Sequence, residues 1–189
     1  MSRDAKSTRS HGILYGFAPW IIFDVVAGPS TWEFAAFTAL AASVILNLPD
    51  LKSGSLKILE IAGIVFFAVI TVLGFFLDRG DMLWLETYAQ TLSSAVIAVV
   101  ALGSLAFTPF TEQYARAEVS HDFWGLPVFR RINRVLTCVW GVVFLVIAIL
   151  GLIAVEAPHT SDWCSWVLPI VLLVGAIKFT AWYPDHAKV

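Results

Sequence analysis

Long apolar runs alternate with short polar segments along the 189-residue chain. Each run contains about twenty residues, the length that a helix needs to cross the hydrocarbon core of a bilayer. Hydrocarbon offers backbone groups no hydrogen-bond partner, so such runs form helices, whereas a β-barrel would need alternating segments of about ten residues. The predicted fold class is all-α: a polytopic membrane protein with a single domain (residues 1–189) of six transmembrane helices, at about 12–28, 32–48, 58–77, 83–107, 132–155 and 163–183.

The composition agrees with a lipid environment. Hydrophobic residues make up 59% of the chain and charged residues 14%, whereas a soluble domain has about 45–50% and about 25%. The mean hydropathy is +0.81. We therefore interpret the bilayer as the solvent of most of these side chains.

The first apolar run has some features of a secretory signal peptide, because basic residues precede a short hydrophobic stretch. It nevertheless contains Asp24 and leads into Gly28 and Pro29 without a convincing small-x-small cleavage motif. We expect this segment to be retained as the first transmembrane helix.

Basic residues are distributed unevenly between the two ends of the predicted helices. Only Arg79, which lies between Asp78 and Asp81, falls on the outer side. The other eleven of the twelve lysines and arginines share one side; these are Arg3, Lys6, Arg9, Lys52, Lys57, Arg116, Arg130, Arg131, Arg134, Lys178 and Lys188. Short loops rich in lysine and arginine stay in the cytoplasm. We therefore predict an inner (cytoplasmic) membrane protein whose N and C termini are both cytoplasmic.

The segment 108–134, between the fourth and fifth predicted helices, contains four arginines. We expect it to begin as a short amphipathic helix in the cytoplasmic membrane interface, with Phe110 and Tyr114 on one face. Its arginines would lie beside anionic phosphates, each contributing about 1 kcal/mol. The segment is either an anchor and topology signal or a site for an anionic lipid headgroup or a partner's acidic tail. The candidate residues of such a site are Arg116, Trp124, Arg130, Arg131, Asn133 and Trp140.

In the fourth apolar run, Glu86, Gln90 and Ser94 lie at helical spacing and form a polar stripe that begins near the outer end of the run. Charge inside hydrocarbon costs about 2.5–3.5 kcal/mol, so an acidic residue there suggests a function. The stripe either lines a water-filled cavity or ion path, or provides hydrogen bonds between packed helices. The small residues Ala98 and Ala101 follow it, so a continuous pore is not expected. The candidate intramembrane polar site comprises Asp24, Glu86, Gln90 and Ser94.

Familiar catalytic motifs are absent from the sequence, among them HExxH, Gly-x-Ser-x-Gly and the Walker loop. Cys138 and Cys164 fall in opposite halves of the predicted membrane domain, so no disulfide is expected. All four histidines lie at helix ends or in loops, which disfavours a haem held between helices. We predict no catalytic residue, no metal, no cofactor and no nucleic-acid partner.

Several motifs of the charged region and its surroundings recur in one family of small membrane proteins. They are Pro109-Phe110-Thr111, Gln113-Tyr114-Ala115, Trp124, Pro127-x-Phe129, Asn133, Thr137 and Trp140-Gly141-x-x-Phe144. With these motifs the chain resembles the intracellular septation protein A family, and its first run, from Phe17 to Asp24, is similar to that family's opening helix. Thr108, where a lysine often precedes the proline, and a longer, more acidic cytoplasmic loop depart from the family pattern. The resemblance is therefore to a divergent member.

The resemblance implies a bacterial inner-membrane protein with a role in cell-envelope or septum biogenesis. Its expected mode of action is interaction with lipids, or with envelope or division proteins, and the resemblance implies no particular reaction. Trp124, Asn133 and Trp140 are the positions that the family motifs single out. The alternative function, which follows from the polar stripe, is transport of a small solute, an ion or protons.

Overall fold

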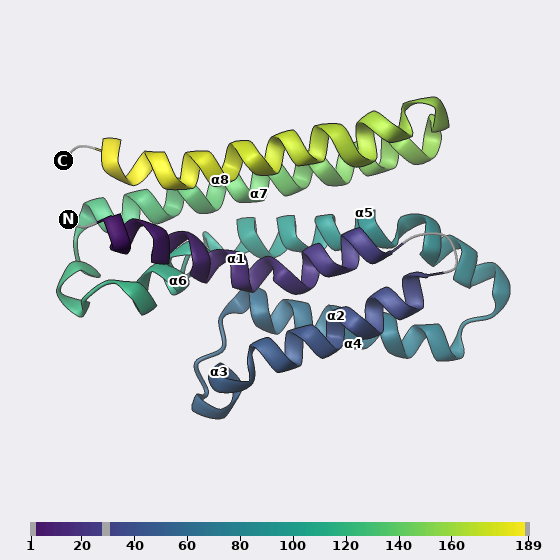
Figure 1. The fold of residues 1–189 in the computed structure, drawn as a ribbon, viewed down its shortest axis with the longest axis horizontal. Helices are drawn as coiled ribbons and strands as arrows, with labels where there is room; N and C mark the ends of the chain where they lie inside the picture. The colour runs from purple at the N-terminus through teal and green to yellow at the C-terminus, as the bar shows by residue number, and fades with distance from the viewer. Residues whose placement is uncertain (1–2, 28–30, 188–189) are drawn as a thin grey trace.

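The computed structural model describes residues 3–27 and 31–187, and no β-strand occurs in that part of the chain (Figure 1). The predicted all-α class is confirmed. The α-helices are α1 (Arg3–Val26), α2 (Trp32–Leu46), α3 (Leu48–Ser53), α4 (Ile58–Phe76), α5 (Arg79–Ser104), α6 (Phe110–Glu118), α7 (Pro127–Glu156) and α8 (Leu168–His186). Three short helical turns connect them, η1 (His121–Phe123), η2 (Pro158–Thr160) and η3 (Trp163–Val167).

Successive long helices run in opposite directions along the long axis of the molecule (Figure 1). α5 packs along α7, α2 packs against both α1 and α4, and α8 lies at the edge of the bundle against α7. The beginning of α1 and the end of α8 lie at the same end of the bundle as α3 and α6 (Figure 1). The connections from α4 to α5 and from α7 to α8 lie at the opposite end.

Four helices are long and apolar enough to cross a membrane, namely Ile58–Phe76, Gly80–Ser104, Pro127–Glu156 and Trp163–His186. Two shorter apolar helices cover Tyr15–Val26 and Trp32–Leu46. The membrane character of the fold is thus supported by four helices, and a total of six spans stays a prediction. The helices α1, α5 and α7 begin before the predicted runs, because a helix continues into polar sequence until a residue such as Pro127 starts it, whereas α2 and α4 end slightly before the predicted limits.

Helix α1 lies at the centre of an aromatic core. On one side, the Phe17 ring stacks on Trp140 and Phe144 of α7, with ring centroids 4.8 Å and 5.2 Å away. On the other side, Trp20 packs against Phe66 and Phe67 of α4 at 5.2 Å and 4.9 Å. Aromatic pairs at such distances contribute about 0.5–1.5 kcal/mol beyond the area that they bury. These contacts hold α1 between α4 and α7.

Large apolar side chains cover much of the outer surface of the helices. Phe76 and Phe107 are 83% and 89% exposed, and Phe75 and Val99 are similarly open. Soluble monomers rarely leave contiguous apolar patches of more than a few hundred Å² in water. This surface is therefore the kind that a membrane protein presents to lipid chains.

Helix α6 differs from the interfacial helix that the sequence suggested. Phe110 and Tyr114 do share one face, but they are only 1% and 3% exposed. The Phe110 ring packs edge-on against Phe17 of α1 at 5.9 Å. The Tyr114 hydroxyl lies against Gly16, where an added Cβ atom would collide with it. The apolar face of α6 is thus turned into the protein, where α1 and α7 pack against α6.

Candidate functional site

A buried polar seam joins α6 to α7. The hydroxyl of Thr111 donates to the backbone carbonyl of Asn133 at 2.8 Å and lies 2.8 Å from the hydroxyl of Thr137. All three residues are buried, and the Asn133 amide donates to the Phe129 carbonyl at 2.9 Å. The Asn133 side chain is therefore used within the helix packing.

A second set of contacts joins α6 to the start of α4. The backbone N–H of Ile58 donates to the Gln113 side-chain carbonyl at 2.9 Å. Lys57 Nζ lies 5.0 Å from the centre of the Tyr114 ring, 2.6 Å from Asp50 Oδ2 and 3.0 Å from Glu60 Oε1. Together the two sets of contacts fix α6 in position between α4 and α7.

Asp50, Lys57, Glu60 and Tyr114 form a cluster in which the neighbouring groups shift the pKa of Lys57 and that of Tyr114. Burial alone would lower the pKa of the Lys57 ammonium, but the hydrogen bonds and charges of Asp50 and Glu60 leave this pKa above its ordinary value. Burial also raises the pKa of the Tyr114 phenol well above its ordinary value, and the Glu60 carboxylate adds to the effect. Lys57 is therefore a cation and Tyr114 a neutral phenol around neutral pH.

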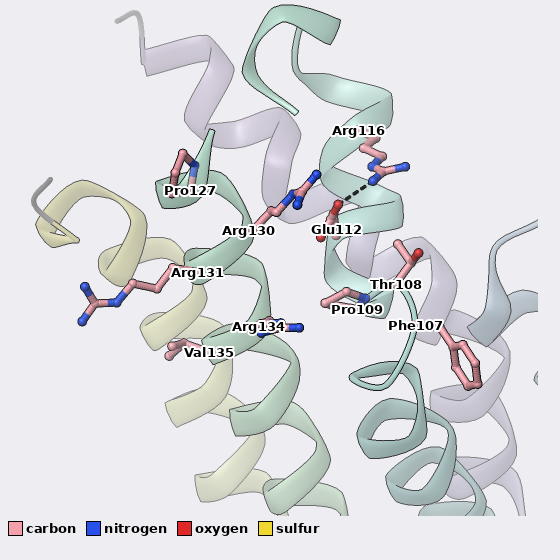
Figure 2. A pocket seen from close by; sticks show the side chains of 10 residues that line it. All are labelled: Phe107, Thr108, Pro109, Glu112, Arg116, Pro127, Arg130, Arg131, Arg134 and Val135. Atoms are coloured by element: carbon pink, nitrogen blue, oxygen red, sulfur yellow. Dashed lines mark hydrogen bonds and ion pairs between the residues drawn. The ribbon is translucent and has the colours of Figure 1, made fainter. Parts of the chain in front are cut away.

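A cavity of about 550 Å³ lies between α6 and the first turns of α7. Figure 2 shows that the side chains of Arg130 and Arg134 extend from α7 toward α6, whereas Arg131 points away from it. The lining residues are Phe107, Thr108, Pro109, Glu112, Arg116, Pro127, Arg130, Arg131, Arg134 and Val135. We call this cavity the arginine pocket.

The arginine pocket contains one internal ion pair. Arg116 donates to Glu112 Oε1 at 2.6 Å, and the Glu112 side chain is only 5% exposed. The Arg116 guanidinium also lies 5.1 Å from the centre of the Trp124 ring, and the Trp124 indole N–H donates to the Val119 carbonyl at 3.1 Å. Glu112 and Trp124 therefore fix the position of Arg116.

The pocket has an excess of positive charge. Glu112 is the one acidic residue among its lining residues. Within the described part of the chain, no ion pair joins Arg130, Arg131 or Arg134 to a carboxylate. The guanidinium groups of Arg130 and Arg134, which extend toward α6, are consequently available to an external anion.

The structure gathers only part of the predicted cytoplasmic site. Arg116, Arg130 and Arg131 line the arginine pocket, and Trp124 supports Arg116 from outside the lining. The sequence reasoning did not include Arg134 or Glu112. The signal that would have found them is helical spacing, because Arg134 follows Arg130 by four residues and Arg116 follows Glu112 by four.

Trp140, another predicted site residue, lies deep in the bundle. Its indole N–H donates to the Thr180 hydroxyl of α8 at 3.0 Å, and its ring is 2% exposed. With Phe17 stacked on the same ring, Trp140 connects α1, α7 and α8. Its position is that of a packing residue, away from the arginine pocket.

The predicted polar stripe faces a second cavity, of about 370 Å³, at the other end of the bundle; we call it the outer cavity. Three of the four candidate residues, Asp24 of α1 and Gln90 and Ser94 of α5, line it together with residues of α7, η3 and α8. The Gln90 side-chain amide donates to the backbone carbonyls of Asp24 and Ala27 at 2.7 Å and 3.0 Å. Gln90 therefore lines the outer cavity and also joins α5 to α1 by hydrogen bonds.

Glu86 is not among the residues that line the outer cavity. Thr87 and Thr91 line it instead, with Gln90 and Ser94, at the i, i+3, i+4, i+7 spacing of a single helix face. Glu86 precedes Thr87 by one residue and therefore lies on an adjacent face of α5. The face of α5 that lines the cavity is thus displaced by one residue from the predicted polar stripe.

Comparisons with protein-family models, with curated proteins and with solved structures give no match. The fold and site therefore define a class: an α-helical protein with four helices of membrane-crossing length and an arginine-lined pocket at one end. Relationship to the intracellular septation protein A family stays a prediction from the sequence motifs.

Proposed function

We propose that this protein is a six-span inner-membrane protein that binds the phosphate of an anionic lipid headgroup in the arginine pocket. The observation that supports the proposal most is the pair of Arg130 and Arg134, whose guanidinium groups extend toward α6 at one cavity (Figure 2) and have no carboxylate partner in the described chain. Arginine suits this role, because its planar group donates paired hydrogen bonds to phosphate oxygens. The one carboxylate of the lining, Glu112, is held in the ion pair with Arg116, so we propose binding as the task of the pocket.

The location of the pocket supports a lipid as the source of the phosphate. The pocket includes the first turn of α7, a helix of membrane-crossing length, and Phe107, an 89% exposed side chain. Headgroups of an adjoining leaflet would lie at this depth, with their chains along the apolar surface below. Each arginine near an anionic surface contributes about 1 kcal/mol.

The shorter helices Tyr15–Val26 and Trp32–Leu46 are proposed as the remaining two spans. They alternate in direction with the longer helices (Figure 1), which would place both termini and α6 on the cytoplasmic side. Reporter fusions are expected to place residues 50, 121 and 189 in the cytoplasm and residue 80 outside. Appearance of residues 50 and 121 on opposite faces would contradict the six-span topology.

The double variant Arg130→Gln/Arg134→Gln is expected to weaken binding of a fluorescent phosphatidylglycerol by about 30-fold, from about 1 kcal/mol for each arginine. Titration of the detergent-purified protein measures this affinity, with phosphatidylcholine as the neutral-lipid control. Arg131→Gln is the matched variant, because Arg131 lies on the same helix but points away from α6 (Figure 2). An equal loss for Arg131→Gln would indicate general surface charge, and no loss for the double variant would refute the pocket.

A role in cell-envelope or septum biogenesis is proposed from the family resemblance. Supporting it, the motif residues Thr111, Asn133 and Thr137 form the seam that docks α6 on α7, and so hold one wall of the arginine pocket. The motif thereby preserves a binding site at the proposed cytoplasmic face. Envelope or division proteins that act on anionic lipids would be the partners of such a site.

Transport of a small solute, an ion or protons is the second candidate function, and the outer cavity favours it. Beyond Ser94, however, Ala98 and Ala101 are buried in the contact with the neighbouring helices, so the cavity has no visible continuation to the other end. Flux across liposomes that a change of the lining residue Gln90, such as Gln90→Leu, abolishes would favour transport over lipid binding.

A further inference from the structure

Most of the outer cavity is apolar, with its strongest polar groups on one wall and the serines Ser161 and Ser165 beside η3. The polar wall consists of the Asp24 carboxyl group and the hydroxyl and amide groups of α5. Phe144 and Ile147 of α7 and Ile170 and Leu173 of α8 are among the apolar residues that line the rest. A predominantly apolar cavity of several hundred Å³ with a few convergent polar groups is the usual form of a small-molecule site.

Asp24 is the strongest polar group of this wall. Its Oδ1 atom is buried and has no hydrogen-bond partner in the described part of the chain, and the Ser93 hydroxyl of α5 is likewise buried without one. No lysine, arginine or histidine is among the cavity's lining residues. A buried carboxyl group without a partner is costly, so a ligand that supplies a cationic donor would be favoured there.

The helical turn η3 shapes the opposite side of the cavity. It is a π-helical turn, in which the backbone N–H of Leu168 donates to the carbonyl of Trp163 five residues earlier. Single π-turns of this kind occur often at functional sites. Here the turn contributes Cys164, Ser165 and Trp166 to the lining. The Trp166 ring adds an aromatic face, to which organic cations bind through the ring quadrupole.

The cavity opens between α1 and α8. Its lining residues Ile21 and Val25 on α1 and Trp166 and Ile170 on the α8 side remain about half exposed or more. These flanking residues are apolar, so a ligand with an apolar body can enter from the lipid as well as from the aqueous side. The mouth thus suits an amphipathic molecule.

We propose that the outer cavity binds an ammonium group attached to an apolar body, with the Asp24 carboxylate as its anion. The hydroxyl groups of Ser94 and Thr91 accept further N–H bonds, and the apolar side chains of α7 and α8 surround the hydrocarbon part. This chemistry has two sources in a membrane: a free alkylamine, or the ethanolamine headgroup of a phospholipid. The proposal is independent of the arginine pocket, which lies at the other end of the bundle.

The test is calorimetric titration of the detergent-purified full chain with hexylammonium, and with 1-hexanol and hexanoate as neutral and anionic analogues. Wild-type protein is expected to bind hexylammonium in preference to both analogues, and Asp24→Asn to lose affinity about tenfold or more. Glu156→Gln is the matched control, because Glu156 is an exposed acid at the same end but outside the lining. Trp166→Leu, a change at a half-exposed ring, is expected to weaken binding of hexylammonium more than binding of hexanol. This second variant provides the test if Asp24→Asn does not fold.

A second arm distinguishes the two sources. Native mass spectrometry of protein released from nanodiscs compares retention of phosphatidylethanolamine with that of phosphatidylglycerol, in wild type and in Asp24→Asn. Retention of phosphatidylethanolamine that depends on Asp24 and that hexylammonium displaces assigns the site to the lipid; hexylammonium binding without such retention assigns it to a free amine. Equal binding of hexanol and hexylammonium, or unchanged hexylammonium affinity in both Asp24→Asn and Trp166→Leu, would overturn the proposal.

Discussion

Lys57→Met is expected to lower the free energy of unfolding by about 3 kcal/mol, since removal of one partner from a buried ion pair leaves the other charge uncompensated. The side chain of Glu60 is 3% exposed, and its Oε1 atom lies 3.0 Å from Lys57 Nζ. The same ammonium group is 2.6 Å from Asp50 Oδ2. Methionine retains the length and most of the volume of lysine, so the loss of charge is the main change.

Unfolding in mixed micelles of a mild detergent and dodecyl sulfate, followed by circular dichroism, measures this effect. Lys52→Met is the matched control, because Lys52 is an exposed lysine of α3 in the same region. Its expected change is within about 0.5 kcal/mol. The double variant Lys57→Met/Glu60→Gln is expected to recover part of the loss, because it also removes the uncompensated carboxylate. Similar losses in the two lysine variants would contradict the role of the ion pair.

The helices of this protein could be predicted because their signal is local. Runs of about twenty apolar residues define membrane helices with little regard to their neighbours, and every predicted run overlaps one observed long helix. The helix limits were less predictable. α1 begins at Arg3, well before its apolar run, because polar residues continue a helix at no great cost once it has formed.

The candidate sites were only partly predictable because side-chain partners come from other helices. The spacing of Gln90 and Ser94 gives a common face, and this face does line a cavity with Asp24. The sequence could not show that Asn133 bonds within α7 and is buried under Thr111, or that α6 turns Phe110 inward. Those outcomes depend on how α6 docks on α1 and α7, which no pattern within one helix records.

Gly141→Val is expected to lower the free energy of unfolding by about 2 kcal/mol, within the range found for overpacked cores. α5 and α7 approach closely at this point, and a Cβ atom added to Gly141 would lie 2.6 Å from Cδ2 and 2.7 Å from Cγ of Leu102. The backbone nitrogen of Leu102 would be 3.4 Å from the same atom. Rotation of the Leu102 side chain therefore relieves only part of the collision, and the two helices must separate to accommodate the branched side chain.

Gly175→Val in α8 is the matched control, because an added Cβ atom there meets nothing within 4 Å. Both substitutions replace a helical glycine with the same residue, so propensity cancels in the comparison and the difference reports the helix contact. The double variant Leu102→Ala/Gly141→Val is expected to lose less unfolding free energy than the sum of the two single losses, because Leu102→Ala removes the colliding atoms. Equal stability of the two glycine variants in the same micelles would show that α5 and α7 do not meet at Gly141.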